Sequence, residues 1–524
     1  MQSITFRFKQ SSFIFSLLLF ALILGISLVI GKFYSIDGPA HMYNVKIMTD
    51  FLTGGNNYAE YFKVNSWTIP NNLSHFILMG LCQLFSMEKA EIIFQFLLCV
   101  SIPLSIVSFL KNCGTKLHLV HLILLIIVPF NFFLLMGFYN YLLAVALMFW
   151  TLACLSRYML SDTWWNRKLM LIFILFLLSF QAHVFVFIFL CACSVLLVIS
   201  YSISSQNKIN RKKLLNLIPV TILPVFLTVR YLAGRDNSLQ KEYKKSSEIL
   251  THFVQLDIFG LLSERERLYT YLMFISLFFL LSAVIFLIFQ KLKSGQESWR
   301  RWSPTRLFFA LVFLMFIVSA FSFPDSDGHG GFITYRLIFF FYLFLIAWLI
   351  SEAEIVSAIY LVAPFIVLAM YLRIDYYRYE MKKLAALTDR VHHAIEDIPE
   401  GSLVLPIDAT NHWMLGHLGN HLTYSDKKII ILENYEATVD YFPLRWISDR
   451  MPFSNFQALM LQACSNERFV YDSLASHRID YLFVAGQAEA NRHPCQTQLL
   501  AVKDNLELYK EYDGFKLYKW KSVK

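Results

Sequence analysis

The sequence predicts an α-helical polytopic membrane protein of about 11 transmembrane helices, followed by an α/β domain. Of its 524 residues, 57% are hydrophobic and 16% are charged, whereas an average soluble domain has roughly 45–50% and about 25%. The charge is also uneven, because 45 of the first 372 residues are charged against 38 of the last 152. We therefore expect a membrane domain over residues 1–372 and a domain of soluble composition over residues 373–524.

Eleven apolar runs in the first part are long enough to cross a bilayer or nearly so. The first shows no small-residue cleavage site after Ile30, so we interpret it as a retained helix and not as a signal peptide. The predicted spans are 11–31, 91–110, 117–136, 139–156, 169–182, 183–203, 214–232, 268–290, 307–322, 333–350 and 355–372.

Basic residues cluster on alternate connections between these runs, which predicts a cytoplasmic N-terminus and an extracytoplasmic C-terminal domain. The clusters are Arg7/Lys9, Lys111/Lys116, Arg157/Arg167/Lys168, Lys208/Arg211/Lys212/Lys213 and Lys291/Lys293/Arg300/Arg301/Arg306. The net charge of +9 divides into +11 over residues 1–372 and −2 over residues 373–524. The basic excess therefore belongs to the membrane loops and requires no nucleic acid to explain it. Two long loops, 32–90 and 231–267, then lie on the outer face with the C-terminal domain.

One further apolar stretch runs from Leu73 to Phe85. If it crossed the membrane, every later basic cluster would lie on the outer side, against the positive-inside rule. It is only about four turns long, and Pro70-Asn71-Asn72 precede it. We therefore predict a re-entrant or surface-lying segment on the outer face.

The C-terminal domain begins with a helical stretch, Tyr377 to Ile398, and continues with short β-rich runs. These runs are 402–407, 428–432, 481–485, 506–512 and 515–520. Asp513-Gly514 predicts a two-residue hairpin between the last two. Cys464 and Cys495 form a disulfide or stay as two thiols, and the sequence leaves both alternatives open.

Asp37 is the first candidate for chemistry, in the segment Tyr34-Ser35-Ile36-Asp37-Gly38-Pro39-Ala40-His41 that follows the first span. A carboxylate at the membrane surface is costly unless it is solvated, paired or used. The competing interpretation is a helix N-cap, since Asp before Gly-Pro suits a helix start. If a helix begins here, His41 lies one turn later on the same side.

A second cluster lies on the loop from Phe323 to Gly331 and at the start of the next span. It contains Asp325, Asp327, His329 and Arg336 as candidate substrate-binding residues. Arg336 suits a phosphate because guanidinium is always charged and forms paired bonds, although it also suits snorkelling to the interface. Two carboxylates do not fill a divalent cation's shell of about six oxygens, so we expect no metal and no other cofactor.

Weaker candidates complete the set. Asn140 lies at an outer helix end and is expected to line the substrate site. His417 and His421 have a spacing that shares a helical face, but no further ligand completes a metal site. The aromatic and polar segment Asn434-Tyr435-Glu436-Ala437 suits either sugar contact or packing of a loop on the domain core.

With an N-terminal span, a long outer loop opening on Asp37, a surface-lying apolar segment, many further spans and an outer C-terminal domain, the chain resembles the GT-C superfamily of membrane glycosyltransferases. That group includes the protein O-mannosyltransferases and the aminoarabinose transferase of lipid A. Unlike several members, this chain has no second acidic residue beside Asp37, where Gly38 and Pro39 follow.

The resemblance implies an enzyme that transfers a hexose or pentose from a polyprenyl-phosphate carrier to a lipid, glycan or protein acceptor. Asp37 would be the general base, and Arg336 would neutralise the leaving phosphate with help from His329 or His41. We expect a bacterial inner membrane protein whose partners are this donor, membrane lipid and the acceptor, with no nucleic acid. The alternative from another class is a polytopic transporter or lipid flippase, and a third is a membrane-anchored binding protein.

Overall fold

The computed structural model describes residues 2–66, 69–160, 167–204, 211–235, 239–260, 264–294, 303–408, 410, 412–439, 441–447, 479–486 and 506–521. The chain divides into two compact units. The helical unit comprises Met1–Gly31, Phe96–Leu134 and Tyr139–Arg378. The mixed unit comprises Lys32–Gln95, Leu135–Phe138 and Tyr379–Lys524.

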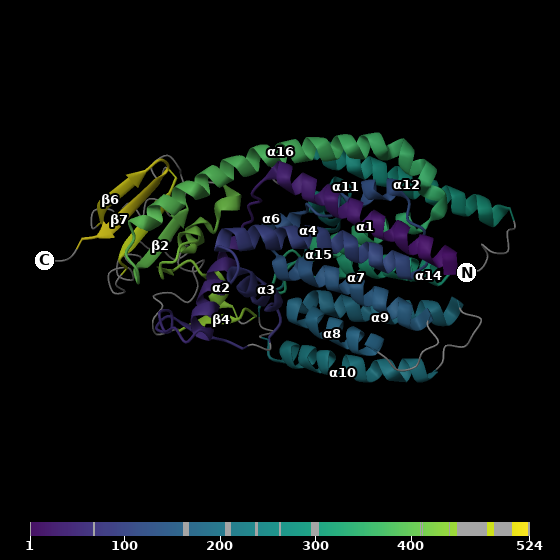
Figure 1. Cartoon of the computed structure of the whole chain (residues 1–524), viewed down its shortest axis with the longest axis horizontal. Coiled ribbons are helices and arrows are strands. Elements are labelled where there is room, and N and C mark those ends of the chain that lie inside the picture. The colour runs from purple at the N-terminus through teal and green to yellow at the C-terminus, as the bar shows by residue number, and fades with distance from the viewer. Residues whose placement is uncertain are drawn as a thin grey trace. The chain divides into compact units, whose positions relative to one another are not determined.

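Long apolar helices form the helical unit (Figure 1). They are α1 (Gln2–Ile30), α4 (Met87–Asn112), α7 (Tyr139–Leu160), α8 (Arg167–Ala182), α9 (Val184–Ser204), α10 (Arg211–Ala233), α12 (Arg267–Lys293), α14 (Pro304–Ser322), α15 (Ile333–Ser351) and α16 (Val356–Glu396). Shorter pieces are η1 (Leu119–His121), α5 (Leu122–Leu125), α6 (Phe132–Met136), α11 (Ser246–Gln255), η2 (Asp257–Phe259), η3 (Glu264–Glu266) and η4 (Ala353–Ile355). Both α4 and α16 continue into the mixed unit.

Within the described residues, nine helices are long and apolar enough to cross a membrane. The chain is therefore an integral membrane protein, and the predicted polytopic helical fold is confirmed. Two of the eleven predicted runs differ in detail. Residues 117–136 form no single helix, since Pro129 lacks an amide hydrogen and the Asn131 side chain bonds the Val128 and Pro129 carbonyls. The run 169–182 is a continuous helix, α8, but it has only 16 residues.

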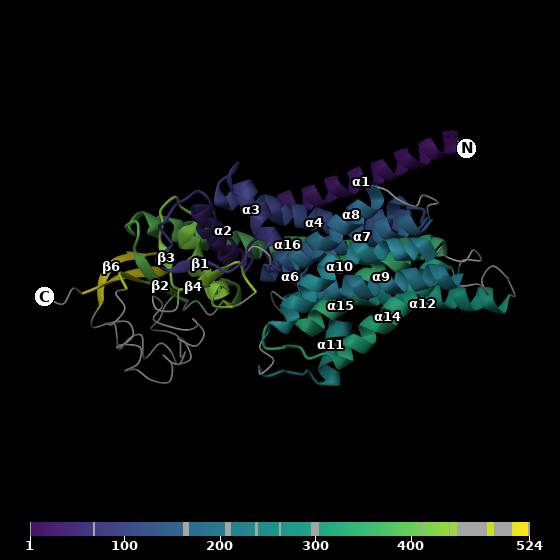
Figure 2. The ribbon, with the colours of Figure 1, turned by 90° about the horizontal axis from the view of Figure 1, so that it is seen from below.

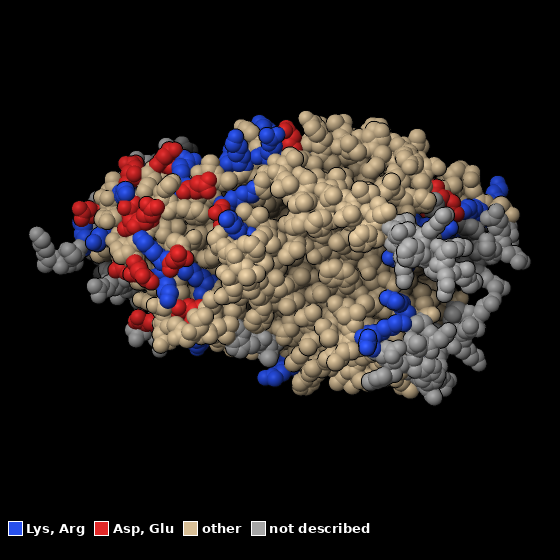
Figure 3. Space-filling model, in the orientation of Figure 1, with Lys and Arg blue, Asp and Glu red and all other residues tan. Residues whose placement is uncertain are grey.

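The core of the helical unit lies around α15 and α7. Aromatic rings fill it, as Phe316 contacts Phe340 and Phe344 with ring centroids 5.2 and 5.6 Å apart. By contrast, α10 exposes apolar side chains such as Ile222, at 59%. Figure 3 shows a broad surface without charged side chains over the helices. An apolar exposed surface of this extent is expected of a protein whose surroundings are lipid.

A five-stranded sheet forms the C-terminal part of the mixed unit, in the order β3-β2-β5-β7-β6. The strands are β2 (Leu403–Asp408), β3 (Ile430–Ile431), β5 (Tyr481–Ala485), β6 (Leu506–Tyr512) and β7 (Phe515–Trp520). β2 is parallel to β3 and β5, whereas β7 is antiparallel to β5 and β6. The predicted hairpin is present, with Gly514 at φ +89° between β6 and β7. The α/β class of this region is confirmed.

The first long loop folds with the C-terminal residues inside the mixed unit. It contributes α2 (Gly38–Leu52), α3 (Leu73–Cys82) and β1 (Phe62–Val64). The C-terminal residues add β4 (Leu444–Trp446) and the 3₁₀ turns η5 (Trp413–Leu415), η6 (Leu418–Thr423) and η7 (Tyr435–Thr438). β1 pairs antiparallel with β4, so loop and domain share one sheet (Figure 2).

α3 has ten residues, or about 15 Å, which is too short to cross a hydrocarbon core of about 30 Å. This length agrees with the segment predicted to lie along the surface. The predicted helix 377–398 is the last part of α16, and the boundary between the two units falls inside that helix. Cys464 and Cys495 lie outside the described residues.

Candidate active site

Asp37 stands directly before α2, in the position of its N-cap. Its side chain accepts no capping hydrogen bond, although Pro39 occupies the first turn as a helix start favours. The residue is only 8% exposed, so its carboxylate is buried at a helix N-terminus without serving as the cap. The structure therefore does not support the capping interpretation.

The backbone around Asp37 is fixed by the short segment 135–138. The amide nitrogens of Ile36 and Asp37 donate to the carbonyls of Leu135 and Met136 at 2.9 and 3.1 Å. Gly137 has φ +80°, and a Cβ placed there would lie 2.8 Å from the nitrogen of Gly38. Only glycine satisfies both the left-handed backbone and this close approach. Gly137 thus fixes the backbone at Asp37, and it lies between the predicted spans 117–136 and 139–156.

His417 lies between two carboxylates. Its Nε2 is 3.6 Å from Asp37 Oδ1, and its Nδ1 is 3.0 Å from Glu433 Oε1. The imidazole is stacked on the ring of Tyr435, with centroids 4.6 Å apart and planes at 17°. The Glu433 carboxylate and the Tyr435 ring therefore fix the orientation of the His417 imidazole beside Asp37.

Burial and neighbouring charges shift the pKa values of Asp37 and His417 in opposite directions. Burial raises the pKa of the Asp37 carboxyl, and the His417 and His41 imidazoles reduce that rise. Burial disfavours the charged form of His417, but the hydrogen bond and charge of Glu433 together with the charge of Asp37 outweigh it and raise the pKa of His417. Burial also raises the pKa of Glu433. All three pKa values are therefore raised, and perturbed groups gathered around one buried carboxylate are typical of acid–base sites.

His41 also lies in the first turns of α2, and its amide donates to the Asp37 carbonyl at 3.0 Å. Its ring contacts Gly137 O through Nε2 at 3.0 Å and Glu436 Oε1 through Nδ1 at 2.8 Å. The predicted pair Asp37 and His41 is therefore present on one helix turn. Each side chain has its own carboxylate or imidazole partner, Glu436 for His41 and His417 for Asp37.

The second predicted cluster belongs to the helical unit, where its carboxylates hold loops together. Asp327 accepts the amides of His329 and Gly330 at 3.0 and 2.9 Å, and its Oδ2 pairs with Arg235 at 2.9 Å. Asp325 accepts the Thr334 amide at 3.0 Å, at the start of α15. Both carboxylates are engaged with their own loops.

Arg336 and Asn140 also belong to the helical unit. The Arg336 guanidinium lies over the rings of Tyr141 and Phe185, 5.4 and 5.9 Å from their centroids. Asn140 is buried in the first turn of α7. The binding roles predicted for these residues, and for His329, stay predictions.

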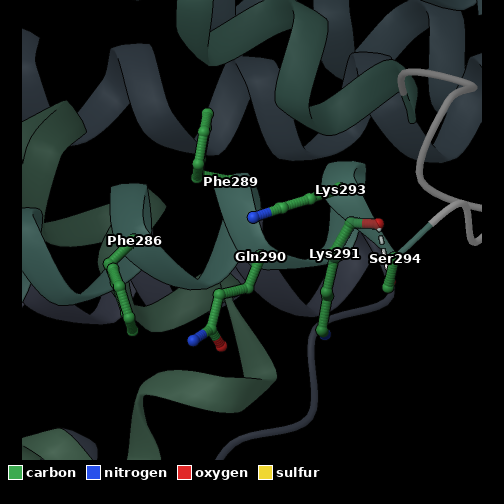
Figure 4. Close-up of a pocket in the computed structure, with 6 residues that line it drawn as sticks. All are labelled: Phe286, Phe289, Gln290, Lys291, Lys293 and Ser294. Carbon is green, nitrogen blue, oxygen red and sulfur yellow. Dashed lines mark hydrogen bonds between the residues drawn. The ribbon is translucent and has the colours of Figure 1, made fainter.

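A hollow at the end of α12 contains none of the predicted site residues (Figure 4). Phe286, Phe289, Gln290, Lys291, Lys293 and Ser294 line it. Lys291 pairs with Glu354, and Ser294 bonds the Lys291 carbonyl at 2.9 Å. All six residues lie within positions 286–294 at one helix end. In the part of the chain that the structure describes, no side chain from a distant segment joins them in lining the hollow, so it does not resemble a substrate site.

The sequence singles out Asp37 and His41 as candidates, but it does not indicate which side chains lie against them. The sequence predicts a helical face shared by His417 and His421, and it predicts sugar contact or loop packing for Tyr435 and Glu436. Neither prediction places these residues beside Asp37 or His41. Glu433 and Gly137 carried no local signal. A helical face shared by His417 and His421 does not form, because η6 begins after His417 and the two rings have different neighbours.

Solved structures of membrane glycosyltransferases resemble this fold. The arabinofuranosyltransferase AftD from Mycobacteria aligns with 97% of this chain and 40% of its own, at 11% identity and a TM-score of 0.55. ArnT from Cupriavidus metallidurans aligns over 96% and 97%, at 9% identity and 0.49. Archaeal oligosaccharyltransferase AglB from Archaeoglobus fulgidus aligns over 97% and 74%, at 10% identity and 0.42.

No protein-family model matches the chain, and no curated protein sequence matches it. The likeness to AftD, whose TM-score exceeds 0.5, therefore carries the fold assignment, and this chain spans two fifths of the AftD chain. The apolar multi-helix unit and the C-terminal sheet agree with the polytopic helical fold and the α/β region that the sequence predicted. The chain has the fold of the GT-C membrane glycosyltransferases.

Proposed function

We propose that this protein is a membrane glycosyltransferase that moves a sugar from a polyprenyl-phosphate carrier to a lipid, glycan or protein acceptor, with Asp37 as general base. The observation that supports it best is the setting of Asp37. Its carboxylate is buried, accepts no capping bond and faces His417, which Glu433 holds from the other side. A carboxylate kept in this way suits proton transfer better than it suits helix capping.

The proposed step transfers one sugar by direct displacement. The acceptor hydroxyl oxygen forms a bond to the anomeric carbon, and its proton passes to Asp37. The bond between that carbon and the carrier phosphate oxygen breaks, and its electron pair leaves on the phosphate. A positioned base contributes typically 10²–10⁴-fold to such a step.

Burial adapts Asp37 to this role because it raises the carboxyl pKa toward the pH at which a base works. His417 keeps the carboxylate from losing its charge altogether, since its imidazole lowers the same pKa. For the leaving phosphate we keep the assignment of Arg336, whose permanent charge suits developing negative charge. His329 and Asn140 are proposed as secondary substrate contacts, whereas the contacts of Asp325 and Asp327 favour a role in holding their loops.

The membrane placement follows from the charge of the loops. We propose a bacterial inner membrane protein with a cytoplasmic N-terminus and a periplasmic C-terminal domain, because basic clusters alternate along the chain. The long loop that carries Asp37 and the C-terminal residues that carry His417 would then share the outer side, as their common β1–β4 pairing requires.

Mass spectrometry of surface glycans and glycolipids tests the assignment of Asp37. Cells carry the native chain, no chain, Asp37→Asn or Asp50→Asn at matched abundance in the membrane. Asp50 is the matched control, since it is a buried aspartate of the same helix that pairs with Lys428 at 3.1 Å. We expect deletion and Asp37→Asn to lose the same sugar, and Asp50→Asn to retain it.

Two outcomes would contradict the proposal. If Asp37→Asn restores the glycan that deletion removes, Asp37 is not the base. If deletion removes an intact lipid-linked glycan from the outer leaflet while it accumulates inside, the chain moves lipid instead of transferring sugar.

A further inference from the structure

We propose that His41, His75 and Glu436 bind a divalent zinc ion inside the mixed unit. The three side chains come from α2, α3 and η7, and they are 4%, 0% and 0% exposed. One nitrogen or oxygen from each lies within 4.8 Å of the others. Zinc would join the first loop to the C-terminal residues at the turn that carries Asp37.

The donor atoms already lie at near-ligand spacing. His41 Nδ1 is 2.8 Å from Glu436 Oε1, and His75 Nε2 is 3.7 Å from Glu436 Oε2. Donors bound tetrahedrally at zinc distances of 2.0–2.1 Å are about 3.4 Å apart. Side-chain rotations that lengthen the His41 contact and shorten the His75 contact would bring three donor atoms, which lie within 4.8 Å of one another, around one ion.

Each imidazole is held by its other nitrogen, as metal-binding histidines are. His41 Nε2 donates to Gly137 O at 3.0 Å, and His75 Nδ1 donates to Asn71 O at 3.2 Å. A carbonyl only accepts, so these bonds direct His41 Nδ1 and His75 Nε2 toward Glu436. Asn71 adopts φ +68°, a left-handed conformation that asparagine tolerates better than most residues.

Hydrogen bonds also hold the Glu436 carboxylate in place. The Asn44 amide donates to Glu436 Oε2, and Asn434 Nδ2 in turn donates to Asn44 Oδ1 at 2.7 Å. Chains of this kind orient a ligand oxygen and are typical around metal sites. The Phe442 ring closes the cluster, 6.1 and 6.3 Å from the centroids of His41 and His75.

The surroundings of His75 Nε2 also favour an ion in this cluster. His75 Nε2 is fully buried and 3.7 Å from Glu436 Oε2, beyond hydrogen-bond distance, with no hydrogen-bond partner among the described residues. A buried polar nitrogen without a partner is costly. A zinc ion would satisfy it, because two imidazoles and one carboxylate are a zinc donor set that leaves a fourth position open.

Direct metal measurement tests the site without any activity assay. The full chain is purified in detergent, treated with EDTA, titrated with zinc chloride and passed through a desalting column before elemental analysis. We expect one zinc per chain and a Tm that rises with zinc. His75→Gln and Glu436→Gln should bind at least about 100-fold more weakly, since even loss of a second-shell partner costs 10–100-fold.

Two controls locate the effect. His421→Gln removes an equally buried histidine of the same unit and should bind zinc as the native chain does. Asp37→Asn should also keep its zinc, so a failure of the metal proposal and a failure of the proposed base give different results. If His75→Gln does not fold, X-ray absorption at the zinc edge of the native chain must show imidazole ligands.

The proposal is overturned if the native chain takes up no stoichiometric zinc. Full binding by both His75→Gln and Glu436→Gln would overturn it equally. So would an edge spectrum without imidazole scattering.

Discussion

The two clusters that the sequence singled out, around Asp37 and around Asp325 to Arg336, have similar compositions and different surroundings. In the helical unit, Asp327 accepts two backbone amides and pairs with Arg235, with 29% of its side chain exposed. In the mixed unit, Asp37 accepts no capping bond, and its side chain is 11% exposed beside His417. A carboxylate that its own loop satisfies stabilises that loop, whereas a buried carboxylate 3.6 Å from an imidazole is better suited to proton transfer.

Among the variants that test this comparison, Gly137→Ala should lose the most activity. The added Cβ would be 2.8 Å from the Gly38 nitrogen and 3.1 Å from Asp37 Cβ, and φ would stay at +80°. We expect activity to fall by about 100-fold, as small displacements of a catalytic group can produce, and stability to fall by about 1–3 kcal/mol. Glycan transfer in detergent and thermal unfolding measure the two losses.

Gly54→Ala is the matched control, since Gly54 has φ +79° with no atom within 4 Å of the added Cβ. It should lose stability but keep activity. Equal activity losses in the two variants would show that backbone strain, and not displacement of Asp37, is responsible.

His417→Gln should have the second-largest effect, which is a change in the pH dependence of sugar transfer. The native imidazole lowers the pKa of Asp37, so its loss raises that pKa. Because the base works only when deprotonated, the acidic limb of the kcat/KM profile should move to higher pH. At neutral pH we expect a fall of about 10- to 100-fold, less than full loss of a base can cost.

The comparison variant for this profile is His421→Gln, which removes a buried histidine that contacts Tyr34 and Tyr424. Its acidic limb should stay in place. An unmoved limb in His417→Gln would mean that another group titrates in that range.

Asp327→Asn should have the smallest effect and the opposite pattern. The amide oxygen still accepts the loop amides, but the ion pair with Arg235 is lost, which for a partly exposed pair costs about 0.5–1 kcal/mol. We expect a slightly lower Tm and unchanged kcat. A large fall in kcat with unchanged Tm would instead place Asp327 in the chemistry and remove the contrast with Asp37.

Local patterns were sufficient for most of the fold. Apolar runs located the nine long helices, because about twenty apolar residues cross a bilayer whatever their neighbours are. Alternation and the Asp513-Gly514 turn located β6 and β7. The interruption at Pro129 and Asn131 was missed, since a high average hydropathy hides one proline and one asparagine.

What the sequence by itself determined is therefore the membrane class, the α/β region and the prominence of Asp37 after the first span. Only the tertiary structure decided the setting of Asp37. His417 and Glu433 lie 380 and 396 positions later in the chain, and β1–β4 pairing joins their region to the first loop. Periodicity and turn signals act over a few residues, whereas a buried side chain's partners are chosen by the packing of distant segments.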